Sequence, residues 1–170
     1  MDIFRKLEIT AKRKKKTMIL PESNDPRVIE AAKIILKKKL AKLVLIDTGK
    51  SIKIPENDDL DIIDIGFAKQ FAEDFKALRN KKDKRFTLAE AEKALSDPLL
   101  FACMLLKNNY ADAVVAGSVY STGNVLRSAI QTVGLSRGNR TVSSFFLMSF
   151  PKQHKLSQRV FAYGDCGVLP

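Results

Sequence analysis

The chain has 170 residues, of which 45% are hydrophobic and 29% charged, a composition typical of one globular domain with a sizeable core. Its net charge of +11 favours anionic partners, namely phosphorylated metabolites, nucleic acid or anionic membranes. No apolar run approaches the ~20 residues of a membrane span and no apolar signal core is present, so we expect a cytoplasmic protein. Cys103 and Cys166 form no metal-ligand spacing, so we expect two unpaired thiols and no metal site.

Helices and strands alternate through the first part of the sequence. An amphipathic N-terminal helix runs into a basic cluster at 12–16, which we interpret as a solvated helix end, with a nucleic-acid arm as the alternative. Apolar strands are expected at 17–20 and 43–46. Between them, Asp25 as N-cap and Pro26 in the first turn begin a helix. Such a strand–helix–strand unit nearly always forms a right-handed parallel pair.

Between residues 50 and 110 we expect one short strand followed by helices. Thr87 and Glu90 have the spacing of a capping box, in which each residue satisfies a backbone N–H of the other. They begin one helix, and Pro98 begins the next. The other expected elements are a polar loop at 50–61, a strand at 62–65 and an amphipathic helix at 67–78.

The next stretch predicts a strand, a turn of small residues and a helix. The apolar run at 113–116 predicts a buried strand, which Gly117 and Ser118 end. Ser121 and Thr122 are good N-caps for the helix that follows. Free backbone N–H groups and the positive end of the helix dipole then point the same way, so this junction predicts an anion site.

Arg127 lies in the first turns of that helix, whose apolar spacing is evident from Val125, and adds a fork of charged donors. The alternative is an ordinary strand–helix connection with a surface arginine, because helix N-termini bind anions only where the fold exposes them. No Gly-Lys-Ser/Thr follows, so this is not a Walker loop. Two further β-like runs lie at 141–150 and 160–163.

Six motifs follow one another along the chain. They are Leu20-Pro21-Glu22 with Asp25-Pro26-Arg27; Ala77-Leu78-Arg79 with Lys81-Lys82 and Thr87; Pro98 with Phe101-Ala102 and Met104; Ala116-Gly117-Ser118 through Ser121-Thr122 to Arg127 and Gln131; Ser144-Phe145-Phe146; and Phe161-Ala162 with Asp165 and Gly167-Val168. In this order they resemble the phosphate acetyltransferase family, which also includes phosphate butyryltransferases.

The resemblance implies an α/β fold, a three-layer α/β/α domain with a mostly parallel sheet, as in the isocitrate/isopropylmalate dehydrogenase-like first domain of the family. Residues 1–150 would form this first domain and 151–170 the start of a truncated second domain, because family chains continue well beyond this point. In the family an acetyl group passes between coenzyme A and phosphate in a cleft between two domains, without a metal. The resemblance therefore implies coenzyme A or acetyl-CoA, acetyl phosphate and phosphate as substrates, and no bound cofactor.

The resemblance also assigns roles to individual residues. Arg127 corresponds to a cleft arginine near the reacting phosphoryl or acyl group and is the expected catalytic residue. Arg79 corresponds to an arginine that holds coenzyme A, although a cation placed to match the dipole at a helix end is the alternative. The other residues expected to bind substrate are Gly117, Ser118, Ser121 and Thr122.

Three positions depart from the family pattern. Tyr120 stands where the family has His, Asn124 where it has Asp, and Ser128 where it has Pro, which leaves the fine positioning of substrate open. His154 is expected to be exposed to solvent. Cys166 has no His in its motif and is not expected to be a nucleophile.

Two alternatives to a working acetyltransferase remain open. A coenzyme A- or phosphate-binding remnant without catalysis is one, because the family's second-half serine, arginine and aspartate have no counterpart here. A basic nucleic-acid-binding domain is the other, but it rests on charge alone. The sequence has no recognised reader motif, no Trp and only three Tyr, so we expect no nucleic acid partner. The protein partner expected instead is a second copy of the chain or a separate C-terminal half.

Overall fold

The structure is a computed structural model that describes residues 3–81, 85–151, 153–156, 159–164 and 166. The chain divides into two compact units, Lys14–Gly134 and the combination of Met1–Arg13 with Leu135–Pro170. Four residues of the family motifs, namely Lys82, Asp165, Gly167 and Val168, lie outside the described residues.

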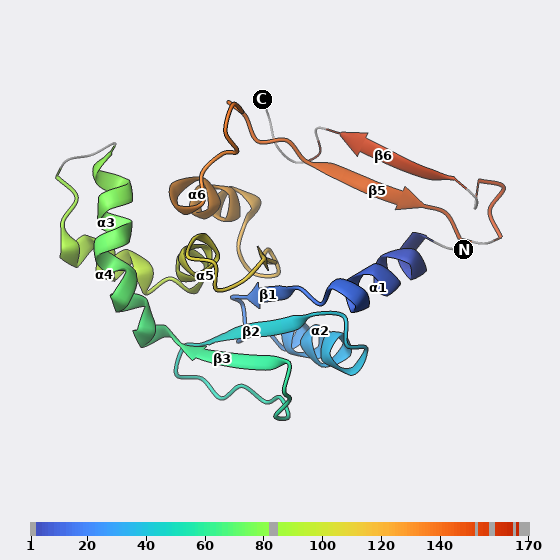
Figure 1. The fold of residues 1–170 in the computed structure, drawn as a ribbon, viewed down its shortest axis with the longest axis horizontal. Helices are drawn as coiled ribbons and strands as arrows, with labels where there is room; N and C mark the ends of the chain where they lie inside the picture. Colours follow the sequence, from blue (N-terminus) through green and yellow to red (C-terminus); the bar gives the residue numbers. More distant parts are fainter. Residues whose placement is uncertain (1–2, 82–84, 152, 157–158, 165, 167–170) are drawn as a thin grey trace. The chain divides into compact units, whose positions relative to one another are not determined.

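The larger unit combines strands and helices, as Figure 1 shows. Its elements are β1 (Thr17–Leu20), α2 (Pro26–Lys37), β2 (Lys42–Asp47), β3 (Leu60–Asp64), the 3-10 helix η1 (Ile65–Phe71), α3 (Ala72–Asn80), α4 (Leu88–Leu95), α5 (Pro98–Lys107), β4 (Ala113–Val114) and α6 (Thr122–Thr132). The remaining elements are α1 (Ile3–Lys14), β5 (Phe145–Ser149) and β6 (Val160–Gly164).

The sheet of the larger unit has the strand order β3-β2-β1-β4, and every pairing in it is parallel. In register, Ile19 of β1 lies between Val44 of β2 and Val114 of β4. The parallel β1–α2–β2 unit predicted from the sequence is therefore confirmed. Because β1 and β4 are parallel neighbours, the loops that follow their carboxyl ends meet at one edge of the sheet.

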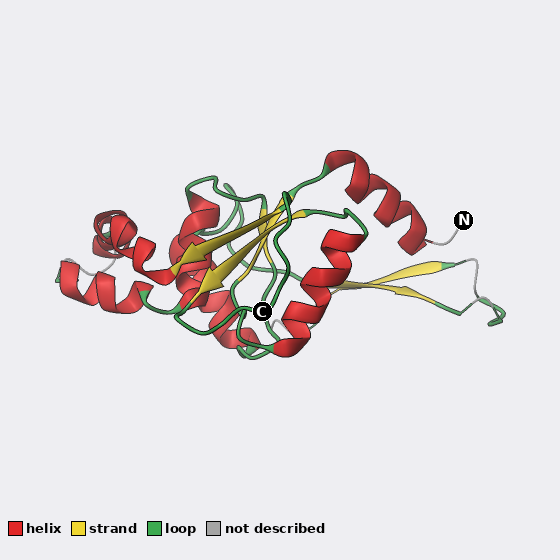
Figure 2. Cartoon of the chain, turned by 90° about the horizontal axis from the view of Figure 1, so that it is seen from below, coloured by secondary structure: helices red, strands yellow, loops and turns green. Residues whose placement is uncertain are grey.

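Helices cover both faces of this sheet, and Figure 2 shows it from below with the helices in red. On one face, Ile19 and Ile46 pack with the buried side chains of η1, α3, α4 and α5. On the other, Leu43 and Leu45 pack against α2. Successive side chains of a strand point to opposite faces of the sheet, so a strand can contribute side chains to both cores. The three-layer α/β/α fold with a parallel sheet is confirmed.

The helix starts predicted from local signals are confirmed. Asp25 caps α2 with Pro26 in its first turn, and Asp97 caps α5 in the same way. Thr87 and Glu90 form the predicted capping box at the start of α4. Each of these signals lies within three residues of the helix start, so the sequence alone suffices to find it.

Two predicted elements of the larger unit differ in the structure. The helix predicted at 67–78 consists of η1 and α3; η1 begins where the Asp64 carboxylate accepts the Gly66 N–H at 2.7 Å. A Cβ at position 66 would lie 2.6 Å from Asp64 Oδ1, so a larger residue here would displace the capping carboxylate. The buried strand predicted at 113–116 is only two residues long and half-buried, because β4 is at the edge of the described sheet. Helix α6 begins at Thr122 with Ser121 as its N-cap, which confirms the start predicted from Ser121 and Thr122.

In the smaller unit, β5 and β6 form an antiparallel pair in which Phe145 lies opposite Gly164 and Ser149 opposite Val160. β5 is shorter than the run predicted at 141–150. His154 is exposed, as predicted, and its ring stacks on Phe150 with centroids 4.5 Å apart.

Both cysteines are free thiols. No helix in the described part of the chain is long and apolar enough to cross a bilayer, and the cytoplasmic location stays a prediction.

Candidate anion-binding site

The junction between β4 and α6 has the local geometry that the sequence predicts. Ser121 is the N-cap of α6, and its Oγ accepts the Asn124 N–H at 3.3 Å. Gly117 has a φ of +116°, a conformation that side chains with a Cβ rarely adopt. This residue turns the chain away from β4 into a loop of four residues, 117–120, that leads directly to the cap.

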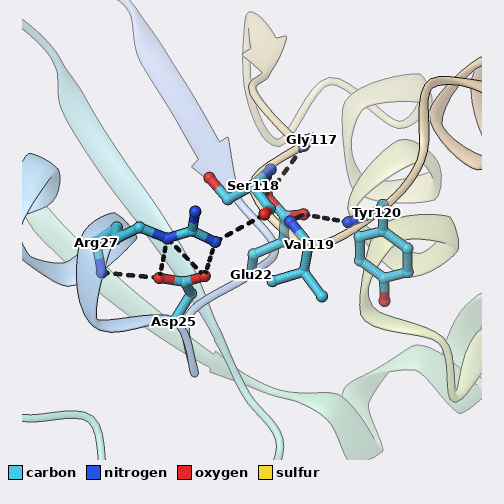
Figure 3. A network of polar contacts seen from close by, with 7 residues as sticks. All are labelled: Glu22, Asp25, Arg27, Gly117, Ser118, Val119 and Tyr120. Atoms are coloured by element: carbon cyan, nitrogen blue, oxygen red, sulfur yellow. Dashed lines mark hydrogen bonds and ion pairs between the residues drawn. The ribbon is translucent and has the colours of Figure 1, made fainter.

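An anion is already bound in this loop, and it is the carboxylate of Glu22 (Figure 3). Glu22 Oε2 accepts the N–H groups of Gly117 at 3.0 Å and Ser118 at 2.9 Å. Glu22 Oε1 accepts those of Val119 at 2.6 Å and Tyr120 at 2.8 Å. Four consecutive N–H groups thus converge on one carboxylate, which is the arrangement of an anion-binding nest.

Glu22 is buried, with 7% of its surface exposed, yet it is held in its charged form. Burial on its own raises the pKa of a carboxyl, because it disfavours charge. The four N–H donors act in the opposite direction and outweigh burial, so the pKa of Glu22 lies below its ordinary value of 4.5. The loop therefore contains a resident negative charge at neutral pH.

The segment after β1 is fixed independently of the loop. The Ser23 hydroxyl donates to the Leu20 carbonyl at 2.9 Å and accepts the Ile46 N–H at 3.0 Å. Ser23 is fully enclosed by its neighbours. The backbone that carries Glu22 is therefore tied to both β1 and β2, and Glu22 extends from a rigid base toward the loop.

Arg27 adds a second connection between the two loops (Figure 3). Its Nη2 donates to the Ser118 carbonyl at 2.7 Å and to Asp25 Oδ2 at 2.5 Å. Asp25 also accepts the Arg27 N–H at 2.8 Å. The guanidinium hydrogen bonds, and then the N–H, lower the pKa of Asp25 from 3.8 to about 2.

Tyr120 fixes the far end of the loop to α5. Its hydroxyl donates to Asp97 Oδ2 at 3.3 Å, while Asp97 Oδ1 accepts the Leu100 N–H at the start of α5. Burial, and then the charge of Asp97, raise the pKa of Tyr120 to about 12. The phenol is therefore neutral and acts as a hydrogen-bond donor to Asp97.

The structure brings four of the predicted site residues together at the junction. Gly117 and Ser118 lie in the loop, and Ser121 and Thr122 lie exposed at the start of α6. The N–H groups of residues 117–120 in the turn are not free, because Glu22 accepts each of them. The roles of Gly117 and Ser118 in substrate binding stay predictions, and they cannot use these N–H groups in this arrangement.

The two predicted arginines lie on neighbouring helices. Arg127 is exposed on α6, and its side chain has no ion pair with any residue that the structure describes. Arg79 is half-buried near the end of α3, which contacts α6, and its guanidinium carbon lies 5.4 Å from the centre of the Phe86 ring. No hydrogen bond or ion pair links Arg79 to the 117–122 junction among the described residues, so their common role in substrate binding stays a prediction.

Sequence reasoning missed Glu22, Arg27 and Asp97 as parts of the site. Glu22 and Arg27 belong to the first family motif, and they follow a predicted parallel strand. The signal that could have found them is the general rule that loops after neighbouring parallel strands meet. Applying this rule requires knowing that β4 pairs with β1, which no local pattern reveals.

In the described part of the chain, no three His, Cys, Asp or Glu side chains gather as a metal site.

Comparisons of the sequence with known proteins all indicate the same family. The family model described as phosphate acetyl/butaryl transferase matches residues 2–170. The phosphate acetyltransferase of Acetivibrio thermocellus is 40% identical over 164 residues, covering 94% of this chain and 49% of that protein. That of Thermoanaerobacterium thermosaccharolyticum is 36% identical over 177 residues, covering 100% and 53%. The chain thus spans about half the length of these curated relatives.

A solved structure gives the same picture. The crystal structure of a phosphotransacetylase from Streptococcus pyogenes superposes with a TM-score of 0.83 at 26% sequence identity. The superposition covers 99% of this chain and 53% of that one. The likeness in sequence and in fold therefore extends over the same half of the longer proteins.

Proposed function

Because the chain belongs to the phosphate acetyl/butaryl transferase family, we propose that it builds one wall of a site at which an acetyl group moves between coenzyme A and phosphate. The observation that carries this proposal is the β4–α6 junction, where a loop closed around an anion leads directly into an exposed helix N-terminus. Both substrates are multiply anionic, so a site for them needs directed donors and cations.

The first turn of α6 supplies the directed donors. The N–H groups of Thr122 and Gly123 have no protein acceptor among the described residues, as is usual for the first turn of a helix. The Ser121 oxygen accepts a hydrogen bond as the cap, but its proton remains available to a phosphate oxygen. These groups, together with the dipole of α6, would hold the phosphoryl group.

The two arginines supply the cations. Arg127 follows on α6 shortly after the N-terminal turn, and in the proposed site its guanidinium offsets the charge on the reacting phosphoryl group. Arg79, on the neighbouring α3, would bind the anionic part of coenzyme A. The planar guanidinium of arginine presents a fork of donors that matches the oxygens of a phosphate group.

The proposed reaction needs no covalent enzyme intermediate. The thiolate sulfur of coenzyme A attacks the carbonyl carbon of acetyl phosphate, a C–S bond forms, the C–O bond to phosphate breaks, and phosphate leaves with the electron pair. In the other direction phosphate attacks acetyl-CoA and the thiolate leaves. The residues of this chain would hold the two anions in contact and reduce their repulsion.

A binding remnant without catalysis is the second candidate. The observation in its favour is that the chain spans about half the length of its relatives, so it matches only part of the residues that those proteins contain. This candidate shares the coenzyme A-binding step and lacks acetyl transfer. Binding and turnover must therefore be measured separately.

The test uses the purified 170-residue chain, with calorimetry for coenzyme A and a phosphate-dependent assay of acetyl-CoA breakdown. We expect coenzyme A binding and slow transfer, with faster transfer when a polypeptide matching the second half of a relative is added. Arg127→Ala should then cost about 2–4 kcal/mol in transition-state stabilisation, the usual scale for one preorganised charge.

Arg137→Ala is the control for a general loss of positive charge, because Arg137 is an exposed arginine outside α6. It should leave binding and turnover unchanged. Coenzyme A binding with no transfer under any condition would favour the remnant. Absence of coenzyme A binding would contradict both candidates, and equal losses in the two arginine variants would contradict the role of Arg127.

A further inference from the structure

We infer that Glu22 is a positioning residue whose carboxylate acts as a permanent resident anion in the 117–120 loop, setting the start of α6 and confining the substrate anion to that helix's first turn. This inference deepens the proposed function and rests on it for the identity of the substrate. The geometry of the loop by itself supports the resident-anion role.

The loop is closed by Glu22 along its whole length. Each carboxylate oxygen accepts two consecutive N–H groups, at 2.6–3.0 Å, from Gly117 through Tyr120. The next residue is Ser121, where α6 begins. The position of the α6 N-terminus therefore depends directly on a side chain that lies 95 to 98 positions earlier in the sequence than the loop residues it binds.

The occupied loop also excludes a second anion. All four N–H groups have an acceptor, so a phosphate that approached the loop would find no free donor there. It would also meet the negative charge of Glu22, because the nearby Arg27 guanidinium is already paired with Asp25. The unused donors that follow the loop are the first N–H groups of α6. The substrate phosphate is therefore directed to the first turn of that helix.

Emptying the loop tests this role directly. Glu22→Ala leaves four N–H donors around a space of carboxylate size, and formate is a carboxylate that fits such a space. In the full chain we expect Glu22→Ala to lower coenzyme A affinity about tenfold, and turnover on the order of 10²-fold, the effect of a misplacement of about 1 Å. Formate should restore both, whereas neutral formamide at the same concentration and ionic strength should not.

Two variants separate this role from a general loss of stability. Glu90→Ala removes a carboxylate that accepts the Thr87 N–H at 2.8 Å in the capping box of α4. It should destabilise the chain without changing coenzyme A affinity and without a response to formate. Glu22→Gln keeps the volume of the side chain, loses the charge and leaves no room for formate, so its defect should not be rescued.

A readout without substrate keeps the inference independent of the proposed function. Hydrogen exchange of the amides at 117–120 should accelerate in Glu22→Ala and slow again with formate, even if the chain does not bind coenzyme A. If Glu22→Ala fails to fold, recovery of folding by formate supports the inference and failure to recover contradicts it. Unchanged amide exchange in a folded Glu22→Ala, or equal rescue by formamide, would also overturn it.

Discussion

At the scale of single residues, Asp25 is the carboxyl whose protonation is most clearly set by one neighbour. Hydrogen bonds from the Arg27 guanidinium and N–H lower its pKa from 3.8 to about 2. A carboxyl whose pKa falls on folding stabilises the native state at pH values above its ordinary pKa of 3.8. This stabilisation is lost as the pH falls toward 2. Asp25→Asn keeps a capping side chain and removes the charge. We predict that it lowers the free energy of unfolding at neutral pH and that its difference from wild type shrinks as the pH falls through this window.

Urea unfolding at a series of pH values measures this difference. Arg27→Gln removes the guanidinium from the same ion pair and should lose the largest share of the pH-dependent part, because the backbone N–H groups still lower the pKa of Asp25. The double variant should lose no more of it than Asp25→Asn, because the guanidinium acts on stability here through the Asp25 carboxylate. A difference that stays constant down to the acid limit would show that the charge pair contributes nothing.

At the scale of elements, Ser121 serves both the fold and the proposed site. It caps α6, so Ser121→Ala should lower the free energy of unfolding by about 1 kcal/mol. Ser121→Asp keeps the cap and adds a negative charge at the helix N-terminus, where we expect the substrate phosphate. We therefore predict that Ser121→Asp remains stable but binds coenzyme A more weakly than Ser121→Ala.

Thermal unfolding and calorimetry of the two variants give the two quantities separately. Thr87→Ala, which removes the cap of α4, is the matched control for the loss of a cap alone. It should lose stability on the same scale and keep its affinity. Coenzyme A affinity that follows stability in all three variants would show that Ser121 acts only as a cap.

The elements themselves show what the sequence can predict. Caps such as Asp25 and Asp97 act on N–H groups within three residues, so local patterns locate them. The apolar runs of β1 and β2 are equally local, and their burial on both faces follows from their composition. The resemblance to a known family supplied what these patterns could not, because it assigned a substrate class to the β4–α6 junction.

The contacts that shape the site are not local. Glu22 bonds to residues 95 to 98 positions away, and Arg27 to Ser118, which is 91 positions away. Their alignment depends on the pairing of β1 with β4, a strand of two residues that carries almost no signal of its own. The sequence therefore predicted that an anion belongs at this junction but not that a side chain of the same chain provides one.

At the scale of the whole molecule, the net charge of +11 bears on nucleic acid binding. Part of this charge is paired: Lys15 lies 2.7 Å from Asp59, and Lys16 pairs with Asp112. We predict weak, non-specific duplex binding with a steep salt slope that vanishes near physiological salt, while coenzyme A still binds. Fluorescence anisotropy with labelled DNA over a salt series measures this. Duplex binding that survives physiological salt, without coenzyme A affinity, would favour a nucleic-acid-binding domain.

The β5–β6 hairpin bears on how the whole chain behaves in solution. Apolar side chains along both of its strands are exposed, with Phe145 at 67% and Phe146 at 60%. A two-stranded hairpin alone is marginally stable, and a cluster of exposed apolar side chains marks a partner surface or an aggregation hazard. We therefore predict that the 170-residue chain self-associates in a concentration-dependent way.

Sedimentation velocity over a range of concentrations measures the self-association. Replacing Phe145 and Phe146 by Ser should weaken it, whereas the control Tyr110→Ser, at an exposed aromatic residue of the larger unit, should not. A polypeptide that matches the second half of a relative should compete if it covers the same strands, because one apolar surface cannot be buried twice. Monomers at every concentration, with the hairpin side chains still exposed to solvent, would contradict the prediction.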